Sequence, residues 1–254
     1  MALPRTPSFG LDGRRALVTG AGRGIGLALA AAMAEAGAAV TLVARTAPEI
    51  EEAAGAIREV GGQAEAIALD VSDMVAVERF FATRSPFHVL INNAGTNRPM
   101  PMWDVTPADF DAVLDLNVKS AFFVAQACVK QMLAEGIRGS LIHVGSQMGH
   151  VGGPNRSLYC ASKWAIEGMN KAFALDLAAK GIRSNTIAPT FIETPMTRPF
   201  FMNDDFKAGV LAKIKLGRLG TVEDLMGAAL YLASDASALV TGTSLIVDGG
   251  WTAE

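Results

Sequence analysis

The sequence has few of the residues that build metal centres, disulfide frameworks and nucleic-acid surfaces. Its 254 residues include two cysteines and three histidines, Cys128, Cys160, His88, His143 and His150. These have neither CxxC nor metal-ligand spacing, so no metal site is predicted and both thiols are expected to be reduced. The net charge is −3 and no run of Lys or Arg occurs, which argues against a nucleic acid or an anionic membrane as a partner.

Long uncharged apolar segments are also lacking. No stretch reaches the roughly 18 uncharged apolar residues of a membrane span, and residues 1–15 contain no apolar signal-peptide core. We therefore expect a cytoplasmic protein whose partners are small molecules and other copies of itself. With 50% hydrophobic and 19% charged residues, the chain can bury the core of one α/β domain over residues 1–254.

Short β-branched segments alternate with longer helical ones along the chain. ALVTG (16–20) precedes an Ala-rich stretch at 25–36, which Gly37 closes, and VTLVA (40–44) follows, giving a strand–helix–strand unit. The alternation recurs, with strands expected at 64–70, 88–92, 139–145, 183–188 and 244–250, and helices near 72–84, 107–135 and 157–180. Six or seven strands separated by helices imply a doubly wound parallel sheet, covered on both faces.

One segment breaks this rhythm, the stretch from Thr190 to Leu216. It separates the sixth strand from the next helix and contains Pro195, Pro199 and two adjacent phenylalanines. Insertions of this length are usually functional, so we expect a substrate loop at about 190–216 that acts as a lid.

A glycine-rich segment, TGAGRGIG (19–26), follows the first strand and opens the first helix. Gly20 would allow a tight turn, Gly24 would let a pyrophosphate approach the backbone, and Gly26 would let the helix pack closely on the strand. The helix N-terminus offers free N–H groups to phosphates. A tight turn that binds no ligand is the alternative reading of these glycines.

Tyr159 and Lys163 lie four positions apart in SLYCASKW (157–164). Positions i and i+4 share one helix face, so the phenol and the ammonium can point into the same space. Taken alone, the pair fits a surface lysine beside a half-buried tyrosine better than a catalytic pair. Other motifs must decide between these interpretations.

Five motifs, in order along the chain, favour the catalytic interpretation of this pair. TGxxxGIG is followed by NNAG (92–95) after an apolar strand, by Asn117 in LNVKS, by Ser146 in VGSQM, and by Tyr159 and Lys163 as YxxxK. From about Asp12 to Trp251 the chain resembles the shorter, roughly 250-residue subclass of the short-chain dehydrogenase/reductase family, which has a Rossmann-type fold. Within it the chain looks most like bacterial 3-oxoacyl-acyl-carrier-protein reductases and the related sugar and polyol dehydrogenases.

The resemblance implies an NAD(P)-dependent oxidoreductase of secondary alcohols or ketones, and it assigns four catalytic residues. Tyr159 would be the general acid and base, Ser146 would orient the substrate oxygen, and Asn117 would bind a water of the proton relay. Bringing a phenol from pKa 10 to neutrality takes roughly 3 units, about 4 kcal/mol. Lys163 would supply much of this and bind the nicotinamide ribose.

The same resemblance assigns the cofactor contacts. They are Gly20, Arg23, Gly24, Ile25 and Gly26 at the glycine turn, Asp70 and Val71 at the adenine, Asn92, Ala94 and Gly95 at the ribose, and Pro189, Ile192 and Thr194 at the carboxamide and phosphate, in addition to Tyr159 and Lys163. Thr190 departs from the pattern, because relatives commonly have Gly there. It either stiffens the start of the loop or adds a hydroxyl to the pocket.

The end of the second strand bears on the choice of cofactor. NAD-preferring enzymes place a carboxylate there, whereas this chain has Ala44 and Arg45, and no acid follows until Glu49. With Arg23 in the glycine turn, two guanidiniums suit the 2′-phosphate of NADP(H). Either arginine could instead be a solvated surface charge. We expect NADP(H) to be preferred and NAD(H) to remain possible.

Substrate contacts are predicted at Gln147, Met148, His150, Phe191 and Met196, with Trp103 nearby. None of these side chains is a fixed cation, so a neutral or weakly polar ketone or alcohol is expected. Core packing is the alternative for each, above all for the methionines.

Alternative functions remain open at this point. The fold also suits a catalytically silent dinucleotide-binding regulator, although the intact catalytic set argues against it, or an NAD-dependent sugar or polyol dehydrogenase. An epimerase or dehydratase would need a larger C-terminal domain.

A homotetramer is expected from the apolar residues on more than one face of the helices at 107–135 and 157–180. These residues are Phe122, Phe123, Val124, Met169, Phe173 and Leu177.

Overall fold

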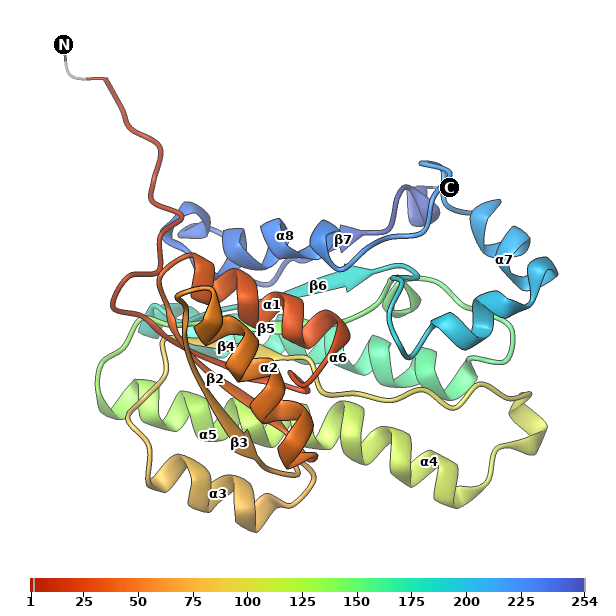
Figure 1. Cartoon of the computed structure of the whole chain (residues 1–254), viewed down its shortest axis with the longest axis horizontal. Coiled ribbons are helices and arrows are strands. Elements are labelled where there is room, and N and C mark those ends of the chain that lie inside the picture. Colours follow the sequence, from red (N-terminus) through yellow and green to blue (C-terminus); the bar gives the residue numbers. More distant parts are fainter. Residues whose placement is uncertain (2, 254) are drawn as a thin grey trace.

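Seven parallel strands form one twisted sheet in the order β3-β2-β1-β4-β5-β6-β7 (Figure 1). The computed structural model describes every residue except 2 and 254. The strands are β1 (Arg15–Thr19), β2 (Ala39–Ala44), β3 (Gln63–Ala68), β4 (Val89–Asn92), β5 (Ser140–Val144), β6 (Arg183–Pro189) and β7 (Ser244–Val247). The chain leaves β1 in one direction for β2 and β3 and crosses back for β4, so the topology is that of a doubly wound sheet.

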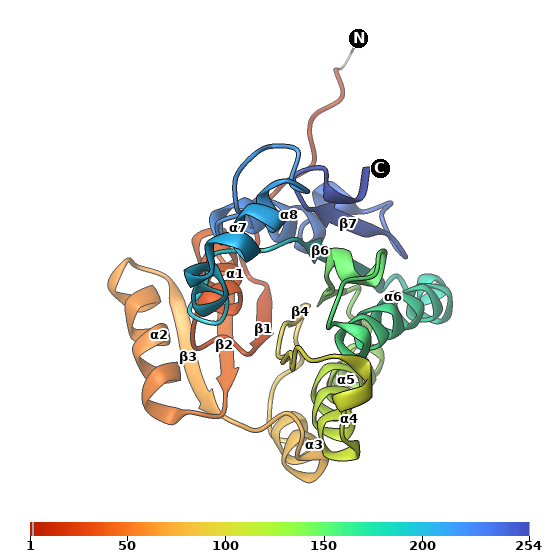
Figure 2. The same ribbon diagram turned by 90° about the vertical axis from the view of Figure 1, so that its right-hand side faces the viewer.

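Helices cover both faces of this sheet (Figures 1 and 2). They are α1 (Gly24–Glu35), α2 (Ala47–Glu59), α3 (Met74–Ala82), α4 (Pro107–Leu114), α5 (Ser120–Ala134), α6 (Ser157–Leu177), α7 (Asp204–Leu211) and α8 (Glu223–Ala233). Short 3-10 turns lie at Met102–Asp104, Gln147–Gly149, Ala178–Lys180, Arg198–Met202, Asp235–Ser237 and Trp251–Ala253. Helices α1, α2 and α8 pack on one face, and α3, α5 and α6 pack on the other.

Alternation along the strands divides the core between these two faces. In β1, Ala16 and Val18 pack with α1 and α8, whereas Leu17 packs with α3 and α5. Strand side chains point alternately to opposite faces, so a sheet covered on both sides needs apolar residues at nearly every position. The predicted doubly wound fold is confirmed, and each strand begins within one residue of its expected position, although β7 ends at Val247 rather than at 250.

The predicted helix at 107–135 is built from three segments. α4 begins with a capping box, in which Thr106 and Asp109 bond to each other's backbone, and Pro107 follows as the first helical residue. A π-helical turn at Asp115–Lys119 then leads into α5. The run Pro107–Ala134 is long and apolar enough by length and composition to cross a membrane. Its buried side, however, carries Val124, Cys128 and Met132 into the core beneath β4.

The expected insertion at 190–216 contains elements that the sequence did not reveal. Besides the 3-10 turn at Arg198–Met202 it holds the short helix α7, whose first turn is capped by the Asn203 side chain. Phe191 is surrounded by aromatic rings: the centre of its ring lies 5.7 Å from those of Phe206 and Trp251 and 6.0 Å from that of Phe201. An aromatic cluster therefore ties the insertion to the C-terminal residues.

Candidate active site

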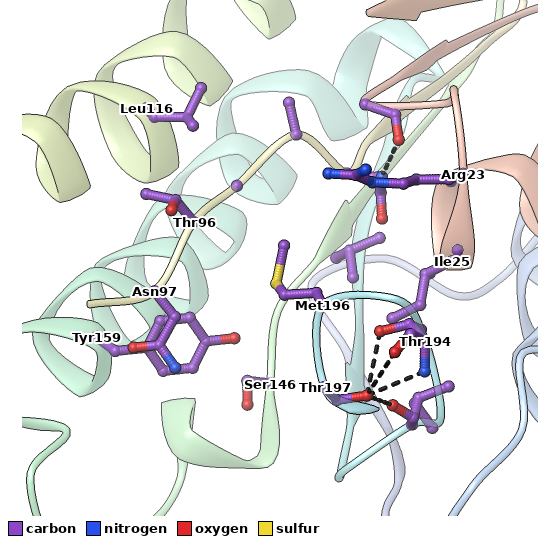
Figure 3. Close-up of a pocket in the computed structure, with 18 of the residues that line it drawn as sticks. Arg23, Ile25, Thr96, Asn97, Leu116, Ser146, Tyr159, Thr194, Met196 and Thr197 are labelled. Atoms are coloured by element: carbon purple, nitrogen blue, oxygen red, sulfur yellow. Dashed lines mark hydrogen bonds between the residues drawn. The ribbon is translucent and has the colours of Figure 1, made fainter. Parts of the chain in front are cut away.

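A cavity of about 840 Å³ opens at the carboxyl edge of the sheet. Its walls come from the segments that follow β1 to β6, together with the start of α6 and part of the insertion. This is where a doubly wound sheet binds ligands, because the connections diverge from the point at which the strand order reverses. Figure 3 shows Tyr159 and Ser146 towards one end, Arg23 towards the other, and Met196 and Thr194 between them.

The glycine turn between β1 and α1 can carry no side chains at two of its positions. Gly20 has φ of 63°, and a Cβ there would lie 2.9 Å from the Ala94 Cα. A Cβ on Gly26 would lie 2.2 Å from the Gly20 carbonyl oxygen. Gly24, with φ of 57°, faces the Thr194 side chain across the cavity. Gly20 and Gly26 thus have steric reasons to be glycine, at the turn and at the helix packing, whereas Gly24 is favoured as glycine by its positive φ.

A neighbouring asparagine fixes this turn, and it is not the one that the sequence pointed to. Asn93 lines the cavity, and its Nδ2 donates to the carbonyl oxygens of Thr19 and Gly20, at 3.0 Å each. Asn92, the predicted cofactor residue, points the other way: its Nδ2 donates to the Ala121 carbonyl at 2.9 Å in the core. The predicted Ala94 and Gly95 do line the cavity. Successive residues along an extended chain point to opposite sides. Asn93 therefore faces the cavity, whereas Asn92, one position earlier, faces the core.

Tyr159, Ser146 and Lys163 meet at one end of the cavity. Ser146 and Tyr159 both line it, and the Ser146 hydroxyl donates to the Gln147 Oε1 at 3.0 Å and accepts from the Met148 N–H at 3.1 Å. The Lys163 Nζ lies 5.6 Å from the centre of the Tyr159 ring and donates to the Val144 carbonyl at 2.7 Å. The i, i+4 spacing therefore places both side chains on the cavity face of α6, as expected.

The pKa of Tyr159 differs from the expectation. Burial raises the pKa of the phenol, while the Ser146 hydrogen bond and the positive charge of Arg156 act against this rise. Burial also lowers the pKa of Lys163 to about 8, and the Glu167 carboxylate limits the fall. In the protein alone the pKa of Tyr159 is therefore raised and not shifted towards neutrality, because desolvation of the phenol outweighs the effects of Ser146 and Arg156.

Asn117 lies behind the cavity wall, in the π-helical turn between α4 and α5. Its Oδ1 accepts from the Thr96 N–H at 2.8 Å, and its Nδ2 donates to the Thr96 carbonyl and to the Ser162 hydroxyl. Ser162 in turn donates to the Tyr159 carbonyl at 2.7 Å. Asn117 therefore joins the loop after β4 to the helix that carries Tyr159. A π-helical turn at such a residue is typical of functional sites.

The far end of the cavity carries charges of both signs. Arg23, Arg45, Asp70 and Val71, which the sequence assigned to the cofactor, all line the cavity. Glu49 lines it too, and its Oε1 lies 3.4 Å from the Arg23 Nε. Although β2 does not end in an acidic residue, Glu49 in the first turn of α2 lines the same end of the cavity as Arg45.

The substrate end is only partly as predicted. Gln147, Met148, Phe191 and Met196 line the cavity, and so do Pro189, Ile192 and Thr194 at the edge of the insertion. His150 is turned away, with its Nε2 2.9 Å from the Ser244 hydroxyl and 3.5 Å from the Glu167 carboxylate. Trp103 is exposed on the surface.

Two cations, Arg98 and Arg156, also line the cavity, so it does contain fixed positive charge, contrary to the expectation. Thr190 lines it as well, and its buried hydroxyl has no hydrogen-bond partner in the described part of the chain. Of the two roles considered for Thr190, its position supports an added hydroxyl in the pocket.

The residues of this cavity fit a dinucleotide. The N-cap residue of α1 is Arg23, whose side chain makes no capping hydrogen bond, which leaves the first N–H groups of the helix available to a phosphate. Among the described residues, no group of three His, Cys, Asp or Glu could hold a metal ion.

Comparison with known proteins agrees with this geometry. A family model described as Enoyl-(Acyl carrier protein) reductase, of the short-chain dehydrogenase type, matches residues 20–252. The chain belongs to the short-chain dehydrogenase/reductase family. It is 38% identical to the D-erythrulose reductase of Gallus gallus over 96% of this chain and 98% of that protein. It is also 38% identical to the gluconate 5-dehydrogenase of Gluconobacter oxydans, over 96% of both chains.

A solved structure extends the comparison. The gluconate 5-dehydrogenase from Burkholderia cenocepacia J2315, in complex with NADP and tartrate, superposes with a TM-score of 0.92 at 38% identity, covering 97% of this chain and 98% of that one. The predicted reaction class is therefore confirmed: this member of the family is an NAD(P)-dependent oxidoreductase that acts on CH–OH groups.

Proposed function

We propose that this short-chain dehydrogenase/reductase interconverts a ketone and a secondary alcohol of a sugar or polyol, with NADP(H) as the preferred cofactor. The observation that carries the proposal is the meeting of Tyr159 and Ser146 at one end of a cavity that begins at the glycine turn. A proton donor and a phosphate-binding turn in one continuous cavity are what hydride transfer to a carbonyl requires.

The chemistry divides between cofactor and protein. When bound, the nicotinamide supplies a hydride to the carbonyl carbon, or accepts one from the carbinol. In reduction, the Tyr159 hydroxyl gives its proton to the carbonyl oxygen, so that the ketone becomes an alcohol. Ser146 holds that oxygen by a hydrogen bond, and in oxidation both groups act in reverse. Lys163, beside the ring, places positive charge where the phenolate forms.

Polar groups in the cavity favour a hydroxylated substrate. Gln147, Asn97 and Thr190 line it, and the Asn97 Oδ1 and Thr190 Oγ1 are buried with no hydrogen-bond partner among the described residues. Buried polar atoms without partners are costly unless a ligand satisfies them. The erythrulose, gluconate and xylulose enzymes among the relatives act on such polyhydroxylated compounds. A sugar or polyol therefore suits the cavity better than an acyl thioester.

Several further features belong to this proposal. Arg45, with no carboxylate at the end of β2, supports the choice of NADP(H), and the insertion at 190–216 serves as a lid because Phe191 and Met196 reach the cavity from it. The location is cytoplasmic.

We also infer a homotetramer. Phe122 and Phe123 on α5 are 38% and 40% exposed, and Trp164 on α6 is 55% exposed, which leaves apolar surface for a second copy. Val124 and Leu177, by contrast, are already used by the core.

The test is a substrate panel read by nicotinamide absorbance. Sugar ketones, polyols and 3-oxoacyl thioesters are compared with NADPH or NADP⁺, and the Tyr159→Phe enzyme is the control for background reduction. We expect kcat/KM for at least one sugar or polyol to exceed that for every thioester by more than about tenfold, a difference of about 1.4 kcal/mol in transition-state binding. Turnover of thioesters alone would reject the proposed substrate class.

A further inference from the structure

Arg156 is a buried cation without a partner in the wall of the cavity. Its side chain lines the cavity, and the residue is only 7% exposed. Among the residues that the structure describes, the Nη1 atom has no hydrogen-bond partner. Within the described part of the chain no carboxylate lies within 4.0 Å of the guanidinium, whereas Arg98, the other arginine at this end, is paired with Asp109 at 2.6 Å.

The backbone around Arg156 is fixed on both sides. Asn155 adopts a left-handed conformation with φ of 58°, and its carbonyl accepts from the Met100 N–H at 3.1 Å. The Arg156 N–H donates to the Gly153 carbonyl, and its own carbonyl accepts from the Cys160 N–H at 2.7 Å. A positive φ in a residue other than glycine is uncommon and needs support from its surroundings. The turn therefore holds Arg156 at one place rather than leaving it mobile.

Stability does not explain an arginine there. Arg156 is the N-cap residue of α6 but makes no side-chain cap, and a cation at a helix N-terminus is opposed by the helix dipole. Burial lowers the pKa of its guanidinium, which reflects the cost of removing the charge from water. One favourable contact is with the Phe200 ring, whose centre lies 5.3 Å from the guanidinium carbon. Because the buried guanidinium lacks a compensating carboxylate and keeps a free N–H donor, its position suits the binding of an anionic ligand.

The position of Arg156 relates this anion to the reacting carbon. Arg156 precedes Tyr159 by three residues on the same helix, and its charge acts on the Tyr159 phenol. Asn97 lines the same cavity, and among the described residues its Oδ1 has no hydrogen-bond partner. A substrate that places its carbonyl oxygen on Tyr159 would have its neighbouring substituents near Arg156 and Asn97.

We propose that Arg156 determines substrate specificity by binding a carboxylate of the substrate through its free guanidinium N–H groups. The substrates are then sugar acids and their keto derivatives, with the carboxylate within a few carbon atoms of the carbon that is oxidised. Asn97 accepts a hydrogen bond from a hydroxyl of the same molecule. This inference rests on the proposed function and narrows it from sugars and polyols to their acids.

A matched pair of substrates tests the assignment. D-Gluconate and D-glucitol share the same hydroxyl configuration and differ in a carboxylate against a CH₂OH group, and further aldonate and alditol pairs of four to six carbons complete the panel. The wild type should prefer at least one acid. Arg156→Gln should lower kcat/KM for that acid by about 10- to 100-fold, as loss of a charge-assisted pair does, and change the value for the alditol by less than about threefold.

Controls separate this role from folding and from an effect on Tyr159. Arg156→Lys should restore part of the acid preference, whereas the surface variant Arg58→Gln should leave it unchanged, and thermal melting shows that each variant is folded. If Arg156 acted on Tyr159 instead, Arg156→Gln would lower kcat for acid and alditol alike and move the pH profile. That result would overturn the assignment.

A binding measurement makes the inference independent of turnover. Titration calorimetry of the NADP⁺-loaded enzyme with each aldonate and alditol should show tighter binding of an acid by the wild type, and the difference should vanish in Arg156→Gln. Such binding without turnover would support the anion site and reject the proposed reaction. Turnover of alditols with no preference for any acid would support the reaction and reject the anion site.

Discussion

The Glu49→Gln variant should increase the preference for NADPH over NADH. At the far end of the cavity the Glu49 carboxylate lies 3.4 Å from the Arg23 Nε, so part of the positive charge expected to meet a 2′-phosphate is already paired. The pair is solvent-exposed, with Arg23 67% and Glu49 32% exposed, and breaking it costs at most about 1 kcal/mol. A freed guanidinium that bonds a phosphate gains roughly 1.5 kcal/mol or more.

These magnitudes set the expected ratio. Removing Glu49 also removes its repulsion of the phosphate, so kcat/KM for NADPH over that for NADH should rise by about tenfold. Arg45→Ala should lower the same ratio by about tenfold. The assay is absorbance at fixed low ionic strength, because salt screens exposed charges, with dissociation constants of both reduced cofactors from fluorescence as a second readout.

A matched control lies on the same helix. Glu51→Gln removes another carboxylate of α2, 64% exposed against 32% for Glu49, which is paired with Arg58 at 2.6 Å and does not line the cavity. It should leave the ratio unchanged. A wild-type ratio below one, or a fall of the ratio in Glu49→Gln, would refute this account and show that Glu49 binds a ribose hydroxyl as NAD-preferring enzymes do.

Three further predictions concern catalysis, stability and assembly. Tyr159→Phe should lower kcat by at least about 10²-fold while the melting temperature and cofactor affinity stay nearly unchanged; retention of most activity would exclude Tyr159 as the general acid. Burial of His143, together with the charge of Lys163, lowers the pKa of its imidazole from 6.5 to about 4. Between these two values the unfolded chain binds a proton at His143 that the folded chain does not, so the folded state loses stability as the pH falls. Urea unfolding should therefore show a loss of about 2 kcal/mol between about pH 7 and pH 5 that His143→Gln lacks, and equal pH slopes would contradict the assignment. Light scattering should give about 106 kDa, four times the chain mass of 26.5 kDa, and a monomer at micromolar concentration would reject the tetramer.

The fold could be predicted because its signals are local and repeated. Each strand is a short apolar run, each helix is longer, and glycines such as Gly37 mark where helices end. The structure of the insertion at 190–216 was harder to predict. Its aromatic residues pack on Trp251, near the other end of the chain, and sequence spacing does not reveal such contacts.

The candidate site was predictable where backbone geometry dictates the residue. A side chain at Gly26 would collide with the Gly20 carbonyl, and such steric demands leave a pattern in the sequence. Asn92 and Asn93 could not be assigned correctly, because one position decides which face of a strand a side chain occupies. Arg156 left no signal, since an arginine in a loop normally lies in water, and its burial depends on the conformation of Asn155 and on the distant Phe200.

The π-helical turn at Asp115–Lys119 lowers the stability of the helix that contains it but positions Asn117 for the site. A π turn contains one more residue than an α turn, so deleting a single residue between 115 and 119 would let α4 and α5 join in an unbroken α-helical register. The resulting helix should be harder to unfold. It would also rotate one of its halves by about 100° relative to the other and remove Asn117 from Thr96 and Ser162. Selection for thermostability alone would therefore tend to remove this extra residue, and its presence indicates that the position of Asn117 matters more to this protein than the strength of the helix.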